Sequence, residues 1–210
     1  MSVANIRQSY EKGELLEAQA STNPLEQFNL WLNEALEQSV PEPTAMTLST
    51  VGADHRPSSR TVLLKGVEED GFVFFTNYAS HKGQELAVNP WACLLFFWQP
   101  LERQIRIEGQ VTKVAPAVSD AYYQSRPLGS RLGAWASNQS QPTELDALQA
   151  RLKDVTEQYG DNPPRPEHWG GYRLEPTLFE FWQGRPSRLH DRLQYTKNET
   201  GIWTRQRLAP

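Results

Sequence analysis

The sequence predicts a mainly β domain with flanking helices, an α+β fold whose sheet is antiparallel or closed into a barrel. Five short runs rich in β-branched and aromatic residues follow one another between residues 45 and 114, and turn signals such as GADHRP and EEDG separate them. Helical patterns stand before and after this block. At 210 residues, the chain has the length of one domain.

The chain is expected to begin with a mobile arm, followed by a helix. Residues 1–23 are polar and weakly patterned, which predicts an arm that precedes a single domain of residues 24–210. The first helix is expected at residues 24–39, where Leu25, Phe28 and Leu32 recur at helical spacing. Asn23 and Pro24 supply its cap and first turn.

The β-rich block is expected to contain a short helix between its third and fourth strands. The five strands are predicted at residues 45–51, 58–67, 71–77, 92–99 and 103–114. The helix is predicted at residues 80–89, with Ser80 as its N-cap and Pro90 as its terminator.

The second half of the chain returns to helices and ends in strands. Helices are predicted at residues 117–126 and 143–160, and strands at residues 172–184 and 188–210, the last turning at KNETG. The connector at residues 125–142 is too rich in Gly, Ser and Pro for a regular element. Its length suggests a functional loop.

Composition limits the partners of the chain. Lys and Arg number 21 against 25 Asp and Glu, a net charge of −4, so the overall field does not recruit nucleic acid or an anionic membrane. The sequence shows neither a signal peptide nor 18 consecutive apolar residues, and we expect a cytoplasmic protein. Cys93 is the only cysteine, which excludes an intrachain disulfide and favours a buried, inert thiol.

The usual signatures of metal and nucleophilic catalysis are missing. The four histidines show no HExxH motif and no paired helical spacing, so no metal site is expected. GxSxG, GxGxxG and P-loop motifs are also missing. The candidates that remain are cations near strands and loops, namely Arg60, Lys65, Lys82, Arg126, Arg131 and the group at residues 185–192.

Two of these cations, Arg60 and Lys65, share one predicted strand. Side chains alternate along a strand, so Arg60 and Lys65 face opposite sides and could meet different anionic groups, or could be solvated charges at the strand end. Lys82 follows a strand end and opens a helix, where free backbone N–H groups favour an anion.

The stretch RPSRLHDRLQY, residues 185–195, carries the densest group of cations. On a strand, residues i and i+2 point to one face, so Arg188, His190 and Arg192 are expected to form a row. Asp191 would point the other way as a structural partner, and Arg185 would lie on the surface. The alternative is an exposed hairpin edge with Arg–Asp pairs.

Taken together, the motifs resemble a known enzyme family. The segments are SSRTVLLKG, FVFFTNYASHKGQELAVNP, LERQIRIEGQV, YYQSRPLGSRLGAWASNQS, HWGGYRL, FEFWQGRPSRLHDR and a terminal RLAP, in this order. They resemble the pyridoxine/pyridoxamine 5′-phosphate oxidase family over nearly the whole chain from residue 24, with a fainter match in RQSYEKG near the start.

The resemblance implies a split β-barrel homodimer that binds FMN in clefts between its subunits. The family oxidises the 4′ carbon of pyridoxine or pyridoxamine 5′-phosphate by hydride transfer to the flavin N5. The products are pyridoxal 5′-phosphate, H₂O₂ from O₂, and NH₃ from the amine. The cofactor carries the redox chemistry, which agrees with the missing nucleophile and metal.

The resemblance also assigns site residues. It implies FMN contacts from Arg60, Thr61, Val62, Leu63, Leu64, Lys65, Phe75, Thr76, His81, Lys82 and Gln104, and from Gln139, Ser140, Trp182 and Arg192 on the dimer-related side. It implies a substrate phosphate site of Lys65, Tyr122, Arg126 and Ser130, with Arg188 and His190 as the catalytic pair against the pyridine ring. Arg7 and Tyr10 match residues that close over substrate.

Some positions depart from the family pattern, and other functions remain open. His81 stands where many relatives carry Arg, Phe75 stands where Tyr is frequent, and GELLEAQA is acidic where a basic stretch is common. One alternative is a split-barrel flavoprotein with another substrate, which has no need of the combined Arg126, Ser130, Arg188 and His190. The other is a carrier of FMN or pyridoxal phosphate without catalysis.

Overall fold

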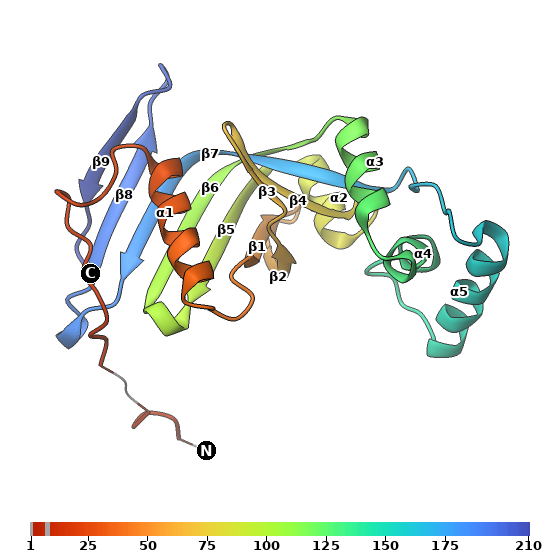
Figure 1. Cartoon of the computed structure of the whole chain (residues 1–210), viewed down its shortest axis with the longest axis horizontal. Coiled ribbons are helices and arrows are strands. Elements are labelled where there is room, and N and C mark those ends of the chain that lie inside the picture. The colour runs from red at the N-terminus through yellow and green to blue at the C-terminus, as the bar shows by residue number, and fades with distance from the viewer. Residues whose placement is uncertain (1, 7–8) are drawn as a thin grey trace.

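The computed structural model describes residues 2–6 and 9–210, and in this part of the chain helices flank one antiparallel sheet (Figure 1). The helices are α1 (Pro24–Glu37), α2 (His81–Val88), α3 (Pro116–Ser125), α4 (Leu128–Ala136) and α5 (Leu145–Tyr159), with 3-10 turns η1 (Gln99–Leu101) and η2 (Pro186–Arg188). The strands are β1 (Ala45–Val51), β2 (Pro57–Leu63), β3 (Gly66–Glu68), β4 (Gly71–Asn77), β5 (Trp91–Trp98), β6 (Arg103–Lys113), β7 (Trp169–Gln183), β8 (Asp191–Lys197) and β9 (Trp203–Arg207).

Strand β7 connects the two ends of the sheet. It pairs with β6 along most of its length, with β4 at its beginning and with β8 at its end. The strand order is β2-β1-β5-β6-β7-β4-β3, and β9 continues the sheet beyond β8. Every pairing is antiparallel. The predicted mainly β, α+β fold is confirmed.

Aromatic side chains form the core between α1 and the sheet. Phe28 of α1 meets Phe72 edge to face with ring centroids 4.8 Å apart, and Trp31 meets Phe181 in the same way at 5.3 Å. Phe28, Phe72 and Phe181 are fully buried. Each ring removed from water contributes about 2–3 kcal/mol, which explains why α1 lies across the sheet on its aromatic face.

The strand predicted at residues 58–67 is two strands. β2 pairs with β1, whereas β3 pairs with β4, so the chain changes partner between them. The Leu64 N–H donates to the Thr44 carbonyl and the Lys65 N–H donates to the Val73 carbonyl. The side chain of Leu64 is buried in the core at this crossing.

The connector at residues 125–142 contains a helix, α4, where no regular element was expected. Its sequence hides an apolar row at helical spacing, because Leu132 and Ala136 are buried and Leu128 lies one turn before them. Glycine in a helix interior costs about 1 kcal/mol, and this packing outweighs that cost.

The row predicted along residues 188–192 is wrong. Arg188 ends the turn η2 and β8 begins only at Asp191, so Arg188 and His190 do not share a strand with Arg192. Ser187 and Arg188 have φ values of 56° and 62°, in a region that costs about 1–2 kcal/mol per non-glycine residue. The chain therefore makes a tight turn that presents Arg188 outside the sheet.

The described part of the segment expected to be a mobile arm makes definite contacts with the sheet. The backbone N–H groups of Glu11 and Lys12 donate to the Glu102 carboxylate at 2.8 and 2.9 Å, and the Leu15 N–H donates to Asp191 at 3.0 Å. Leu15 is buried in the core. The polar composition of the segment gives no sign of these contacts, because they depend on carboxylates far along the chain. The mobility of the arm stays a prediction.

Candidate active site

A cavity of about 490 Å³ lies beside β2 and β4, facing α3 and α4. The predicted residues that line it are Thr61, Val62, Leu63, Lys65, Phe75, Thr76, Lys82, Tyr122, Arg126, Ser130 and Gln139. We call it the main cavity. Thus most residues assigned to FMN and all four assigned to the substrate phosphate surround one space within a single chain.

Lys82 supplies a buried cation at one side of the main cavity. Its side chain is nearly inaccessible, and Nζ donates to Thr76 Oγ1 at 3.2 Å, Ser80 Oγ at 3.3 Å and Gln139 Oε1 at 3.1 Å. Burial lowers the pKa of Lys82, and the positive charge of Arg60 lowers it further. None of the described carboxylates pairs with this ammonium, so an anion bound here would meet an uncompensated charge.

Arg126 supplies a second uncompensated cation. It follows the last residue of α3, and its Nη1 atom is buried without any hydrogen-bond partner among the described residues. Burial lowers the pKa of Arg126. A buried N–H group that no acceptor satisfies is costly, and Lys65, Tyr122 and Ser130 line the same cavity. This donor set suits an oxyanion such as a phosphate group.

Three stacked aromatic rings form one wall of the main cavity. Phe75 stacks on Tyr122 with centroids 3.9 Å apart, and Trp169 lies nearly parallel to both, at 5.7 Å from Phe75 and 6.2 Å from Tyr122. Gly171 permits this arrangement, since a Cβ atom there would lie 2.7 Å from the Phe75 ring. The wall offers flat apolar surface next to the two cations, as a planar ring with an anionic tail requires.

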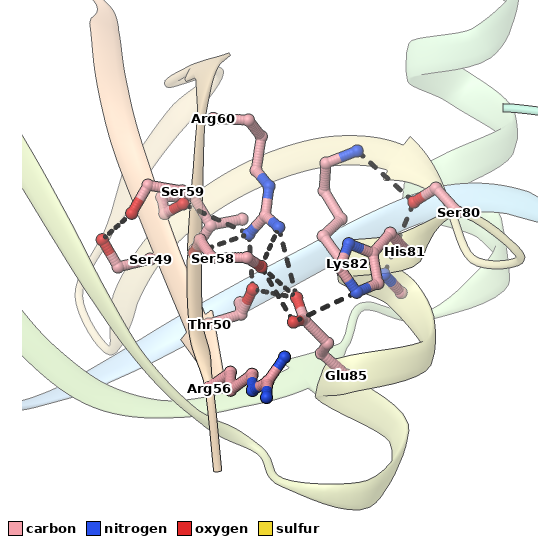
Figure 2. Close-up of polar contacts among 12 residues, drawn as sticks. Ser49, Thr50, Arg56, Ser58, Ser59, Arg60, Ser80, His81, Lys82 and Glu85 are labelled. Carbon is pink, nitrogen blue, oxygen red and sulfur yellow. Dashed lines mark hydrogen bonds and ion pairs between the residues drawn. The ribbon is translucent and has the colours of Figure 1, made fainter. Parts of the chain in front are cut away.

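Arg60 and His81 lie outside the lining of the main cavity. Figure 2 shows both directed toward Glu85 of α2, a side chain that is only 5% exposed. Arg60 Nη2 lies 3.2 Å from Glu85 Oε2, and His81 Nε2 lies 3.4 Å from Oε1. Thr50 and Ser58 also donate to this carboxylate, at 2.6 and 2.7 Å. Burial alone would raise the pKa of Glu85, but these donors and the nearby cations outweigh it and lower the pKa.

A second group of predicted residues lies around the turn η2, in a cavity of about 540 Å³ that includes Tyr10, Arg188 and His190. Tyr10 meets the Trp182 ring at 5.6 Å and the His190 ring at 5.7 Å, and Trp182 lies 4.7 Å from His190. We call Tyr10, Trp182, Arg188 and His190 the η2 cluster. Burial lowers the pKa of His190, and the positive charge of Arg188 adds to the effect.

Gln104 and Arg192 flank Trp182 in the sheet, since Gln104 of β6 and Arg192 of β8 are its register partners. Arg192 does not point to an open site. Its Nε donates to Glu180 at 2.8 Å, and its Nη1 donates to the Ala209 carbonyl at 2.7 Å. Glu180 also accepts from Arg106 at 2.7 Å.

The main cavity and the η2 cluster stand apart in one chain. Figure 1 shows α3 and α4 at one end of the molecule and β8 and β9 at the other. Within one chain, Gln139 lines the main cavity with Lys82, whereas Gln104 lies beside Trp182. The division of the FMN contacts between two subunits stays a prediction. Ser140 is exposed next to Gln139, and Leu64 is in the core. Arg7 lies outside the described residues.

Several residues that line the main cavity were not predicted from the sequence. They are Asn77, Gly133, Ala134, Ser137 and Trp169. Trp169 belongs to the segment HWGGYRL, where two consecutive glycines signal a close approach of other groups. The buried carboxylates Glu85 and Glu180 carried no comparable signal, because their partners are distant in sequence.

Two sequence profiles together match most of the chain. The profile described as pyridoxamine 5′-phosphate oxidase matches residues 32–159, and that of the pyridoxine 5′-phosphate oxidase C-terminal dimerisation region matches residues 169–210. The chain belongs to the pyridoxamine 5′-phosphate oxidase family. The segment that the second profile matches contains every residue of the η2 cluster except Tyr10.

Full-length relatives carry the same family name. A pyridoxine/pyridoxamine 5′-phosphate oxidase of Bordetella pertussis is 62% identical over 210 residues, with complete coverage of both chains. One of Burkholderia orbicola is 59% identical over 212 residues, covering 100% of this chain and 99% of the relative.

Solved structures in this family share the split-barrel fold. PhzG from Burkholderia lata, in complex with tetrahydrophenazine-1-carboxylic acid, is 31% identical with a TM-score of 0.88, covering 95% of this chain and all of its own. An FMN-binding protein related to pyridoxamine 5′-phosphate oxidase, from Nostoc punctiforme, is 20% identical with a TM-score of 0.71, covering 90% of this chain and all of its own. The split barrel expected from the sequence is confirmed. None of the helices in the described residues has both the length and the apolar character needed to cross a bilayer.

Proposed function

We propose that this family member is an FMN-dependent oxidase that converts pyridoxine or pyridoxamine 5′-phosphate, with O₂, to pyridoxal 5′-phosphate and H₂O₂, releasing NH₃ from the amine. The observation that carries the substrate class is the buried Nη1 of Arg126 in the main cavity, which has no hydrogen-bond partner in residues 2–6 and 9–210. A substrate phosphate would accept from it and from the Lys65, Tyr122 and Ser130 side chains. The names of the relatives at 62% and 59% identity support the same substrates.

The residues at the Lys82 side of the main cavity fit FMN. Lys82, Thr76 and Gln139 offer a buried cation and polar groups to an anionic cofactor. Bound FMN would supply the hydride acceptor that no side chain of the chain can provide. Arg60 and His81, held by Glu85 beside the first turn of α2, remain proposed contacts of the cofactor.

We propose that the complete site forms between two copies of the chain. Substrate needs both the phosphate site and the pair Arg188 and His190, yet these stand apart in one chain. A two-fold dimer can place the η2 cluster of one copy over the main cavity of the other, twice. The match of residues 169–210 to a dimerisation region supports this arrangement.

The proposed role of His190 follows from its hydrogen bond. The Arg185 backbone N–H donates to His190 Nδ1 at 3.1 Å, so the neutral imidazole carries its proton on Nε2. The lowered pKa keeps the ring neutral near pH 7. His190 and Arg188 would therefore donate to oxygen atoms on the pyridine ring and orient it. A neutral His190 in this tautomer is not a base, so the substrate proton would leave to water.

The direct test uses the purified protein loaded with FMN. Addition of pyridoxamine 5′-phosphate without oxygen should bleach the oxidised flavin spectrum, and admission of air should restore it while aldehyde and peroxide accumulate. A flavin spectrum that stays oxidised with both B6 phosphates would contradict the proposed oxidase. Aldehyde formation distinguishes the enzyme from a carrier of FMN or pyridoxal phosphate.

A different substrate is the second candidate, because PhzG has a TM-score of 0.88 to this chain and its bound ligand is a carboxylic acid without phosphate. Arg126 could hold a carboxylate as well as a phosphate, so the cavity fits both candidates. Steady-state rates with and without a phosphate group on the substrate decide between the two, since the proposed oxidase should strongly prefer the phosphate ester.

A further inference from the structure

Arg126 differs from several other half-buried arginines in what stabilises its charge. Arg60, Arg165 and Arg192 each lie within 3.2 Å of a carboxylate oxygen. The Arg126 guanidinium instead lies over the indole of Trp169, with its Cζ atom 4.6 Å from the ring centroid. Among the described residues, no carboxylate pairs with it.

The indole ring itself is held rigidly. Trp169 is the first residue of β7 and is 7% exposed. Tyr123 contacts its ring edge to face at 5.4 Å, and Tyr122 lies parallel to it. Arg165 donates to the Trp169 carbonyl at 2.7 Å and to Asp120 of α3 at 2.6 Å, so it ties the start of β7 to the helix that precedes Arg126.

At this position an aromatic face can stabilise the cation and leave its N–H groups available, which a carboxylate could not do. The ring quadrupole attracts a cation without accepting its N–H groups. A carboxylate would use those N–H groups and would repel an incoming phosphate. Arg103 shows the contrast, because it lies 4.4 Å over Trp31 but also pairs with Glu34. The charge of Arg103 is thus paired, whereas Nη1 of Arg126 has no partner within the part of the chain that the structure describes.

We propose that Trp169 is the positioning residue of the phosphate site, holding the Arg126 guanidinium through its indole face so that the N–H groups stay free for a phosphate ester. The inference rests on the proposed function and deepens it. Trp169 acts through Arg126, so its loss should weaken the binding of phosphate esters far more than it changes the chemical step.

The test compares Trp169→Met, which keeps bulk without a ring face, with Trp169→Phe, which keeps a smaller face. With flavin-loaded protein, the KM for pyridoxamine 5′-phosphate should rise about tenfold in the Met variant and about threefold in the Phe variant, with kcat changed less than about twofold. Trp203→Met is the matched control, because Trp203 lies on β9 and packs on Phe179 at 5.4 Å. Its KM should equal that of the wild type.

Two probes separate phosphate binding from other effects. The Kd of inorganic phosphate, measured by calorimetry on flavin-loaded protein, should rise about tenfold in Trp169→Met. The slow oxidation of pyridoxamine, which has no phosphate, should fall much less in Trp169→Met than the oxidation of pyridoxamine 5′-phosphate does. An equal loss with both substrates would show a merely structural role and overturn the inference.

The remaining outcomes are also decisive. A KM and a phosphate Kd within twofold of wild type in the Met variant contradict the role of Trp169, as does a fall in kcat at constant KM. If the Met variant does not fold, the Phe variant decides, and an unchanged phosphate Kd there overturns the inference. Failure of the wild type to oxidise either B6 phosphate rejects the proposed function, while the phosphate Kd values still test Trp169.

Discussion

At the scale of single residues, some buried cations of this protein pair with a carboxylate and others do not. Arg60 and Arg192 meet the buried carboxylates Glu85 and Glu180, so the charges in each pair compensate one another. Lys82 and Arg126 have no such partner among the described residues and both line the main cavity. An uncompensated cation costs stability, so its presence in a cavity indicates a site for an anion.

Substitutions of Lys82 and of Arg188 should therefore have different effects. Lys82→Ala should lose FMN, because the buried cation that holds the anionic cofactor is gone, and gel filtration should release yellow flavin from the protein. Arg188→Ala should keep its flavin but lower kcat by about 100-fold or more, because orientation of a reacting carbon supplies several kcal/mol. The reverse pattern would show that the two sites have been assigned wrongly.

At the scale of elements, one carboxylate joins three strands. Glu180 of β7 accepts from Arg106 of β6 at 2.7 Å and from Arg192 of β8 at 2.8 Å. Burial alone would raise the pKa of Glu180, but the hydrogen bonds from both arginines outweigh it and lower the pKa. A lowered folded-state pKa means that the contribution to stability is complete above the ordinary glutamate value and is lost as the pH falls through the lowered value.

Removal of this charge should be costly and depend on pH. Glu180→Gln should lower the free energy of unfolding by about 3 kcal/mol at pH 7, because Arg192 loses its counter-charge and Arg106 keeps only Glu108. The difference from wild type should shrink as the pH falls below the ordinary value of 4.5. Urea unfolding of both proteins at a series of pH values measures this difference in stability. Glu175→Gln, on an exposed side chain of the same strand, should change little, and an equal loss there would contradict the account.

The arm next to the sheet offers a second test at this scale. Leu15 is 4% exposed, whereas its neighbour Leu16 is 38% exposed. Leu15→Ala should release residues 10–20, which limited proteolysis or hydrogen exchange would detect as faster cleavage or exchange in that segment. Leu16→Ala should leave both unchanged. Equal protection in the two variants would mean that the backbone bonds to Glu102 and Asp191 hold the arm without Leu15.

At the scale of the whole molecule, the sequence pattern predicts the sheet better than the site. Alternating apolar residues identify strands such as β1 and β5, because one face of each is buried. The pairing of Arg60 with Glu85, and the stacking of Arg126 on Trp169, join residues from different elements, and no local pattern reveals such contacts. The helix α4 was missed because tertiary packing outweighs the glycines in its sequence.

The separation of the two residue groups is also a property of the whole molecule. Local motifs identify Arg126 and Arg188, but only the fold shows that they lie at different ends of one chain. A site that needs both must draw them from two copies. This shared site is the central claim of the proposed function.

Complementation between two inactive variants tests the shared site most directly. Arg126→Ala and Arg188→Ala should each be nearly inactive as homodimers. Unfolded together in equal amounts and refolded with FMN, they should recover about a quarter of the wild-type rate, because half of the dimers are mixed and each has one intact site. Recovery to this level supports a site built from two copies. Mixed dimers that form but show no recovered activity would contradict it.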